Sequence, residues 1–133
     1  MQDILQLTEE DRILHKTSLS FDASICEILV PIITGAQVVV AAPGGHKDPS
    51  YLAQIIEAYS VSKIGGVPSM LSILVNELEG SDVFSLRQII VAGEALPRSL
   101  QQQIFDVLPD TTLWNLYGPV SYTHLTLPTI YSV

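Results

Sequence analysis

The sequence predicts an α/β domain in which a mostly parallel sheet is flanked by helices. Segments with helical spacing of apolar residues alternate with short runs rich in β-branched residues. Proline, alone or as Asp-Pro, stands at the start of several helical segments. Strands that are separated by single helices form βαβ units, and these units build parallel sheets.

The first expected helix has apolar residues that recur along one face. They are Ile25, Ile28, Leu29, Ile32 and Ile33. Pro31 should bend this helix because it lacks an N–H group, and Gly35 can end it. Residues 37–41 then predict a strand. Its β-branched run shows no polar alternation, which suggests burial on both faces.

Three more helices are expected, each with a proline near its start. Asp48-Pro49 supplies an N-cap and a first helical residue, and Pro68 and Pro97 open the next two helices. The strands between and after them are predicted at 63–65, 87–92 and 111–116. Right-handed crossovers place the loops after these strands along one edge of the sheet, which is where ligands bind in such folds.

Length, net charge and cysteine content exclude several classes of protein. The 133 residues suffice for one domain, and the charge of -8 argues against binding to a nucleic-acid backbone. The sequence shows neither a signal-peptide pattern nor an apolar run long enough to cross a membrane, so we expect a cytoplasmic protein. Cys26 is the single cysteine, which excludes an internal disulfide, and no Cys/His pattern indicates a metal site.

Several loops at the expected ligand edge carry candidate chemistry, each with a structural alternative. The turn at 43–48 fits a helix cap better than an anion site. Residues 93–95 could admit a flat ligand against the backbone, or form a tight strand-to-helix turn. Residues 115–119 could face a purine or close the strand. Asp22 could cap the first helix or pair with a ligand ammonium.

Taken together, these segments resemble the adenylation domain of nonribosomal peptide synthetases. The resemblance runs from Met1 to about Pro119 in one register. The matching segments are Leu7-Thr8-Glu9-Glu10-Asp11-Arg12, Ser20-Phe21-Asp22-Ala23-Ser24 with Glu27, Thr34-Gly35-Ala36, residues 43–49, Val67-Pro68-Ser69-Met70-Leu71, Ala92-Gly93-Glu94-Ala95-Leu96 and Asn115-Leu116-Tyr117-Gly118-Pro119. No single segment is decisive, but their shared order and spacing are specific.

The resemblance implies a fold position and a reaction. Residues 1–119 would form part of the large N-terminal lobe of an adenylate-forming enzyme. Such an enzyme joins an amino acid to ATP with Mg²⁺, releases pyrophosphate, and passes the aminoacyl group to the phosphopantetheine thiol of a carrier protein. Carrier-protein and condensation domains would be its partners, and neither nucleic acid nor membrane is expected.

The resemblance also assigns binding roles residue by residue. Asp22 would bind the substrate ammonium. The amino-acid side chain would be lined by Ala23, Cys26, Gly65, Ile90, Ala92 and Leu116. The adenine would be surrounded by Gly93, Glu94, Ala95, Asn115, Tyr117 and Gly118. The small, uncharged lining suggests a neutral substrate, and no catalytic residue or metal ligand is assigned.

The sequence departs from the family where the resemblance ends. Val120 and Ser121 stand where the family has Thr-Glu, whose Glu helps to hold Mg²⁺. Residues 120–133 form a tail unlike the family, and residues 121–133 resemble translated adapter DNA, so we expect them to be non-native, with few core contacts. The family's phosphate loop, ribose-binding Asp and catalytic Lys are missing, and Met1 matches an internal position. We therefore expect cuts at both ends and no activity from the chain alone.

Two alternatives remain open. An acyl- or aryl-CoA ligase shares the fold but takes substrates without an amine, and Asp22 argues against it. A non-catalytic module that binds a nucleotide or a partner would fit the missing catalytic parts.

Overall fold

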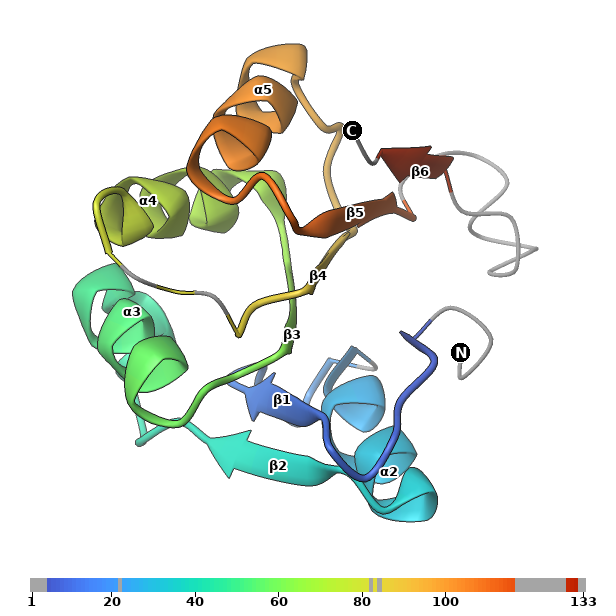
Figure 1. The fold of residues 1–133 in the computed structure, drawn as a ribbon. Helices are drawn as coiled ribbons and strands as arrows, with labels where there is room; N and C mark the ends of the chain where they lie inside the picture. The colour runs from blue at the N-terminus through green and yellow to red at the C-terminus, as the bar shows by residue number, and fades with distance from the viewer. Residues whose placement is uncertain (1–4, 22, 82, 84, 117–128, 132–133) are drawn as a thin grey trace.

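The computed structural model describes residues 5–21, 23–81, 83, 85–116 and 129–131. Within these residues one sheet has the strand order β2-β1-β3-β4-β5-β6 (Figure 1). Its strands are β1 (Arg12–His15), β2 (Gln37–Val40), β3 (Lys63–Gly66), β4 (Gln88–Val91), β5 (Thr112–Asn115) and β6 (Thr129–Tyr131). The first five strands are parallel and β6 is antiparallel to β5, which confirms the predicted α/β class.

Helices cover both faces of this sheet. They are α2 (Ala23–Thr34), α3 (Pro49–Ala58), α4 (Pro68–Leu78) and α5 (Arg98–Val107), with a short 3-10 turn, η1, at Gly45–Lys47. Helices α3, α4 and α5 lie on one face and α2 lies on the other (Figure 1). No helix in the described part of the chain is long and apolar enough to cross a membrane.

The helix starts follow the local signals in the sequence. The Asp48 carboxylate accepts a hydrogen bond from Tyr51 N at 3.1 Å, and Pro49 is the first residue of α3. Pro68 opens α4, and Pro97 occupies the N-cap position of α5. These three predicted starts are confirmed, because caps and prolines act within a few residues of the boundary they set.

The main core lies between the sheet and the three helices α3, α4 and α5. Strand residues Ile64, Ile89 and Leu113 point into it and are at most 2% exposed. A smaller cluster on the opposite face contains Leu5, Leu7 and Ile13, with Val30, Ala36 and Ile90 packed against it. Neighbouring residues of one strand therefore serve different faces, as the pleat requires.

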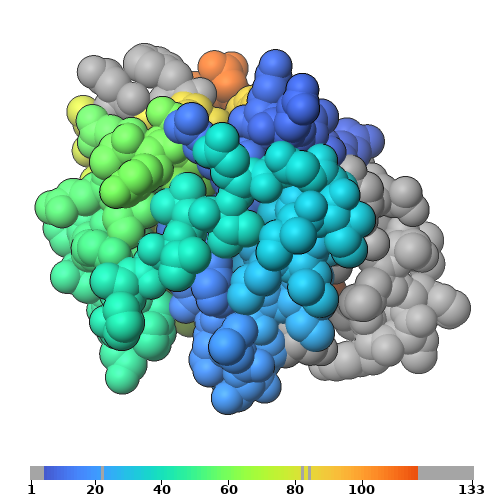
Figure 2. All heavy atoms as spheres, turned by 90° about the horizontal axis from the view of Figure 1, so that it is seen from below, coloured from blue at the N-terminus to red at the C-terminus, as the bar shows by residue number. Residues whose placement is uncertain are grey.

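The apolar face predicted for the first helix does form, but it faces solvent. Ile25, Leu29, Ile32 and Ile33 of α2 are 51%, 50%, 62% and 80% exposed. The buried residues of this helix are Ser24, Glu27 and Pro31. Figure 2 shows α2 and β2, in light blue to teal, uncovered on one side of the molecule. Apolar spacing predicted the helix correctly, but it did not show which side the sheet would cover.

Two strand predictions need correction. The strand predicted to be buried on both faces is β2, which lies at the sheet edge, and its Val40 is 67% exposed. Strand β1, between β2 and β3, was not predicted.

The tail was expected to make few core contacts. Its residues Thr129–Tyr131 pair with β5 through the backbone, and residues 120–128, 132 and 133 lie outside the described ranges.

Candidate functional site

The carboxyl ends of β3, β4 and β5 bring four predicted pocket residues close together. Gly65 pairs in register with Ile90. Beyond the strand ends, Ala92 N donates to the Gly66 carbonyl at 3.2 Å, and Leu116 N donates to the Val91 carbonyl at 2.8 Å. The residues predicted to line the side-chain pocket on the sheet are thus neighbours on adjacent strands.

These four residues also share one face. In β3 and β4, Ile64 and Ile89 point into the core beneath α3, α4 and α5. Gly65 and Ile90 therefore face the α2 side, and the pleat carries this side on to Ala92 and Leu116. A Cβ added to Gly65 would meet its nearest atom, the Ile90 carbonyl oxygen, at 3.7 Å, an ordinary contact. A side chain would therefore meet no steric conflict at Gly65, while Ile90 on the same face packs against the cluster of Leu5, Leu7 and Ile13.

Helix α2 carries the other predicted residues of this pocket. Ala23 is exposed at the start of the helix and Cys26 is half-buried. Ser24 fixes the helix start, because its N and Oγ both donate to the Phe21 carbonyl, at 3.1 and 2.7 Å. Asp22, the predicted partner of the substrate ammonium, lies outside the described residues.

The loop between β1 and α2 is held by a buried carboxylate that sequence reasoning left without a role. Glu27, 7% exposed, accepts hydrogen bonds through Oε2 from Lys16 N at 3.1 Å and Thr17 N at 2.9 Å. His15 Nδ1 lies 2.8 Å from the same oxygen, and Thr17 Oγ1 donates to Oε1 at 2.5 Å. The only sequence signal was that Glu27 belonged to the family resemblance.

Lys16 adds a charge to this cluster. Its ammonium lies 3.7 Å from Glu27 Oε1 and 3.5 Å from Thr17 Oγ1. Burial lowers the pKa of Lys16, and the Glu27 carboxylate opposes that shift through its charge and hydrogen bonding. The loop thus holds a buried, paired charge directly after the carboxyl end of β1.

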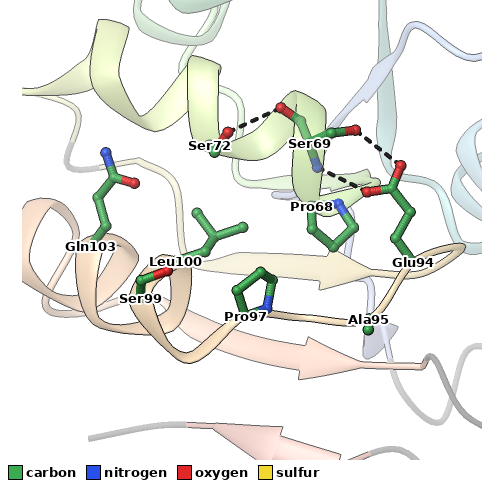
Figure 3. A pocket seen from close by; sticks show the side chains of 9 residues that line it. All are labelled: Pro68, Ser69, Ser72, Glu94, Ala95, Pro97, Ser99, Leu100 and Gln103. Atoms are coloured by element: carbon green, nitrogen blue, oxygen red, sulfur yellow. Dashed lines mark hydrogen bonds between the residues drawn. The ribbon is translucent and has the colours of Figure 1, made fainter.

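The predicted adenine segment follows β4. Gly93 has a φ of 87°, and a Cβ there would lie 3.0 Å from Val67 Cγ1, so this turn favours glycine. Glu94 turns toward α4, where its carboxylate accepts from Ser69 N at 3.2 Å and from Ser69 Oγ at 3.0 Å (Figure 3). The carboxylate occupies the position at this helix start that favours an anion.

An open hollow of about 300 Å³ lies between the N-terminal parts of α4 and α5 (Figure 3). Glu94 and Ala95 line it together with Pro68, Ser69, Ser72, Pro97, Ser99, Leu100 and Gln103. Neither the side-chain pocket residues nor Asn115 line this hollow. Asn115 ends β5, next to β4, while Tyr117 and Gly118 lie outside the described residues.

The described residues do not suggest a metal centre. Across the described ranges, no three His, Cys, Asp or Glu side chains gather closely enough to hold a metal ion. The segment in which the family carries its Mg²⁺-binding Glu has Val120 and Ser121 and lies outside those ranges.

Comparison with known proteins shows relatives of this chain in sequence and in fold. Tyrocidine synthase 3 of Brevibacillus parabrevis is 37% identical over 92% of this chain, which spans 2% of that protein. The nonribosomal peptide synthetase FmoA3 (S1046A) superposes with a TM-score of 0.86 at 27% identity, over 99% of this chain and 14% of FmoA3. FmoA3 has also been solved with AMPPNP and with alpha-methyl-L-serine-AMP bound.

A further solved relative is holo-PA1221, described as containing adenylation and PCP domains bound to a vinylsulfonamide inhibitor. It superposes with a TM-score of 0.76 at 27% identity, over 94% of this chain and 21% of PA1221. The profile of the AMP-binding enzyme family matches residues 1–131. The chain therefore belongs to the AMP-binding enzyme family.

Proposed function

We propose that this chain contributes to the adenylation domain of a nonribosomal peptide synthetase. The reaction joins an amino-acid carboxylate to the α-phosphate of ATP, gives an aminoacyl adenylate and releases pyrophosphate. The aminoacyl group then passes to the phosphopantetheine thiol of a carrier protein. Likeness to FmoA3, which has been solved with AMPPNP and with alpha-methyl-L-serine-AMP, supports the nucleotide and the amino-acid adenylate as ligands. Likeness to PA1221, which contains adenylation and PCP domains, supports the carrier domain as partner.

The observation that carries this proposal is the shared face of four predicted pocket residues. Gly65, Ile90, Ala92 and Leu116 sit at the carboxyl ends of adjacent parallel strands, on the α2 side. Parallel sheets bind ligands at this edge. The walls are apolar or lack a side chain, so they would bind an uncharged amino-acid side chain and exclude a charged one, which would lose its hydration there.

The nucleotide would lie nearer to the turn after β4. Gly93 lets the backbone turn closely at this point, and the Glu94 carboxylate ties the turn to the start of α4. With its side chain engaged by Ser69, Glu94 would serve the nucleotide through its backbone and through the shape of the turn. A phosphate is not expected at the start of α4, because this carboxylate already occupies it.

The exposed face of α2 supports an enzyme larger than this chain. Ile25, Leu29, Ile32 and Ile33 are each at least half exposed, and contiguous apolar surface of this kind marks a protein interface. The chain spans 14% of FmoA3 and 21% of PA1221. Further parts of such an enzyme would cover this face and complete the ATP site.

Pyrophosphate exchange into ATP tests the proposal in the enzyme that carries this segment. We expect exchange that depends on a neutral amino acid and is weak with the matching des-amino acid. The comparison also separates the two enzyme classes, because a CoA ligase would favour the acid that lacks the amine. Exchange supported equally by both acids, or by neither, would contradict the proposed function.

A further inference from the structure

We propose that Glu27 is a positioning residue for the amino-acid pocket, and that it acts by fixing the loop between β1 and α2. This inference rests on the proposed function, because it gives the loop a role in holding substrate. Glu27 itself is buried and contacts the loop, so it is not expected to touch the amino acid.

The carboxylate binds the near end of the loop from within α2. It receives two backbone N–H groups, from Lys16 and Thr17, and the Thr17 hydroxyl. Backbone N–H groups fix the path of the chain, whereas contacts between surface side chains leave it free. Hydrogen bonds to a charged acceptor are about twice as strong as neutral ones, so the charge of Glu27 matters as well as its shape.

The far end of the loop is fixed from the same side of the same helix. Ser24 is 2% exposed, and its N and Oγ both donate hydrogen bonds to the Phe21 carbonyl oxygen. Ser24 and Glu27 are three residues apart in α2, so both project from one face. The segment from Lys16 to Phe21 is thus attached to α2 at both of its ends.

The attached segment leads directly into the pocket. Phe21 and Ala23 are the described residues on either side of position 22, where the family resemblance implies the carboxylate that binds the substrate ammonium. Ala23 is a predicted wall of the side-chain pocket. A shift of the loop would therefore move the amino-acid site without touching Gly93 or Glu94, which serve the nucleotide. A misplacement of about 1 Å can lower activity roughly 100-fold.

The contacts can be tested first in the 133-residue chain by amide hydrogen exchange. Glu27→Gln preserves the side-chain shape and removes the charge. We expect the Lys16 and Thr17 amides to exchange at least about ten-fold faster, in line with a weakened charged hydrogen bond. Glu57→Gln, at an exposed position of α3, is the matched control and should leave both amides unchanged. Unchanged exchange at both amides in Glu27→Gln would overturn the inference.

The functional part is tested in the enzyme that carries this segment. For Glu27→Gln we expect the amino-acid KM in pyrophosphate exchange to rise about 10- to 100-fold, while the ATP KM stays within about two-fold. Thr17→Val removes only the hydroxyl donor and should raise the amino-acid KM in the same direction. Thr17→Ser retains that donor and should restore a near-normal value.

The outcomes separate this inference from the proposed function. Absence of amino-acid-dependent exchange in the unsubstituted enzyme counts against the proposed function itself. Normal exchange with an unchanged amino-acid KM in both Glu27→Gln and Thr17→Val counts against the positioning role alone. An equal loss of affinity for amino acid and ATP would show that Glu27 serves only folding, which also overturns the inference.

Discussion

Asp11 and Arg87 form an ion pair at the amino edge of the sheet, where they join the segment before β1 to the segment before β4. Arg87 Nη2 donates to Asp11 Oδ1 at 2.7 Å, although the residues are 76 positions apart. Asp11 is 2% exposed and also accepts from Ser62 Oγ at 2.8 Å and from Thr8 N at 3.0 Å. The Lys63 ammonium lies 3.6 Å from Asp11 Oδ2, the oxygen that accepts from Thr8 N. This carboxylate connects the segment before β1 to β3 and to the start of β4.

The ionisation of Asp11 is coupled to folding. Burial alone would raise the pKa of Asp11, but the hydrogen bonds from Thr8 and Ser62 and the charges of Lys63 and Arg87 lower it overall. A carboxyl whose folded-state pKa is depressed contributes stability above its unfolded value of 3.8. That contribution is lost as the pH falls through the folded-state pKa.

Asp11→Asn should therefore destabilise the chain in a pH-dependent way. At pH near 6 we expect a loss of about 2–4 kcal/mol in the free energy of unfolding, because charged hydrogen bonds and ion-pair partners are left unmatched. At a pH below 3.8 the difference from the unsubstituted chain should shrink, as the pH falls through the folded-state pKa of Asp11. Urea unfolding near pH 6 and at a pH below 3.8 measures this difference in the free energy of unfolding. Asp110→Asn, at an exposed position, is the control, and an equal loss at both pH values would contradict the coupling.

The exposure of the α2 face makes a second prediction. Ile33 is 80% exposed and Ile104 of α5 is 0% exposed, although both are isoleucines in helices. Ile33→Ala should change the free energy of unfolding of this chain by less than about 0.5 kcal/mol. Ile104→Ala should cost about 2–5 kcal/mol, because it leaves a cavity in the main core. Similar urea midpoint shifts for the two variants would contradict the exposure of this face.

The tail gives a third prediction. Deleting residues 120–133 should change the free energy of unfolding by less than about 1 kcal/mol. The deletion removes an edge pairing of three residues with β5, but it also removes the entropy cost of ordering the segment. A loss of stability well beyond this in urea would show that the tail belongs to the fold, and the view that it is non-native would have to be abandoned.

Local signals made much of the fold predictable from the sequence. Asp48-Pro49, Pro68 and Pro97 mark helix starts because a cap or a proline acts on its own turn. β1 was missed because Arg12–His15 has only two apolar residues, Ile13 and Leu14, between polar ends. The edge position of β2 depends on strand order, which the run of valines does not encode.

The site residues could be proposed from the sequence only through the family resemblance. Gly65, Ile90, Ala92 and Leu116 lie in or directly after three separate strands, and no spacing in the sequence shows that they are neighbours. The Glu27 contacts were missed because they join residues 10 to 12 positions apart across a loop. The hydrogen bonds that the Glu94 carboxylate accepts from Ser69 were missed for a similar reason, because they join residues 25 positions apart.

The remaining prediction concerns Asp22, tested in the enzyme that carries this segment. If its carboxylate pairs with the substrate ammonium, Asp22→Ala leaves that ammonium without a partner. Removing one partner of such a charge pair typically costs ~2–5 kcal/mol, or roughly 30- to several-thousand-fold in kcat/KM for the amino acid. The KM for ATP should change little, because the nucleotide is assigned to the turn after β4.

A role as helix cap gives a different result. Loss of a cap would lower fold stability by ~0.5–2 kcal/mol and leave amino-acid selectivity intact. Measuring kcat/KM for the amino acid and its des-amino analogue side by side separates the two roles. If Asp22 pairs with the ammonium, Asp22→Ala should abolish most of the preference for the amino acid. In the unsubstituted enzyme only the des-amino analogue leaves the Asp22 carboxylate unpaired, and this penalty disappears when the carboxylate is removed. An unchanged preference in Asp22→Ala would remove Asp22 from the substrate site, and with it the strongest reason to prefer amino-acid activation over CoA ligation.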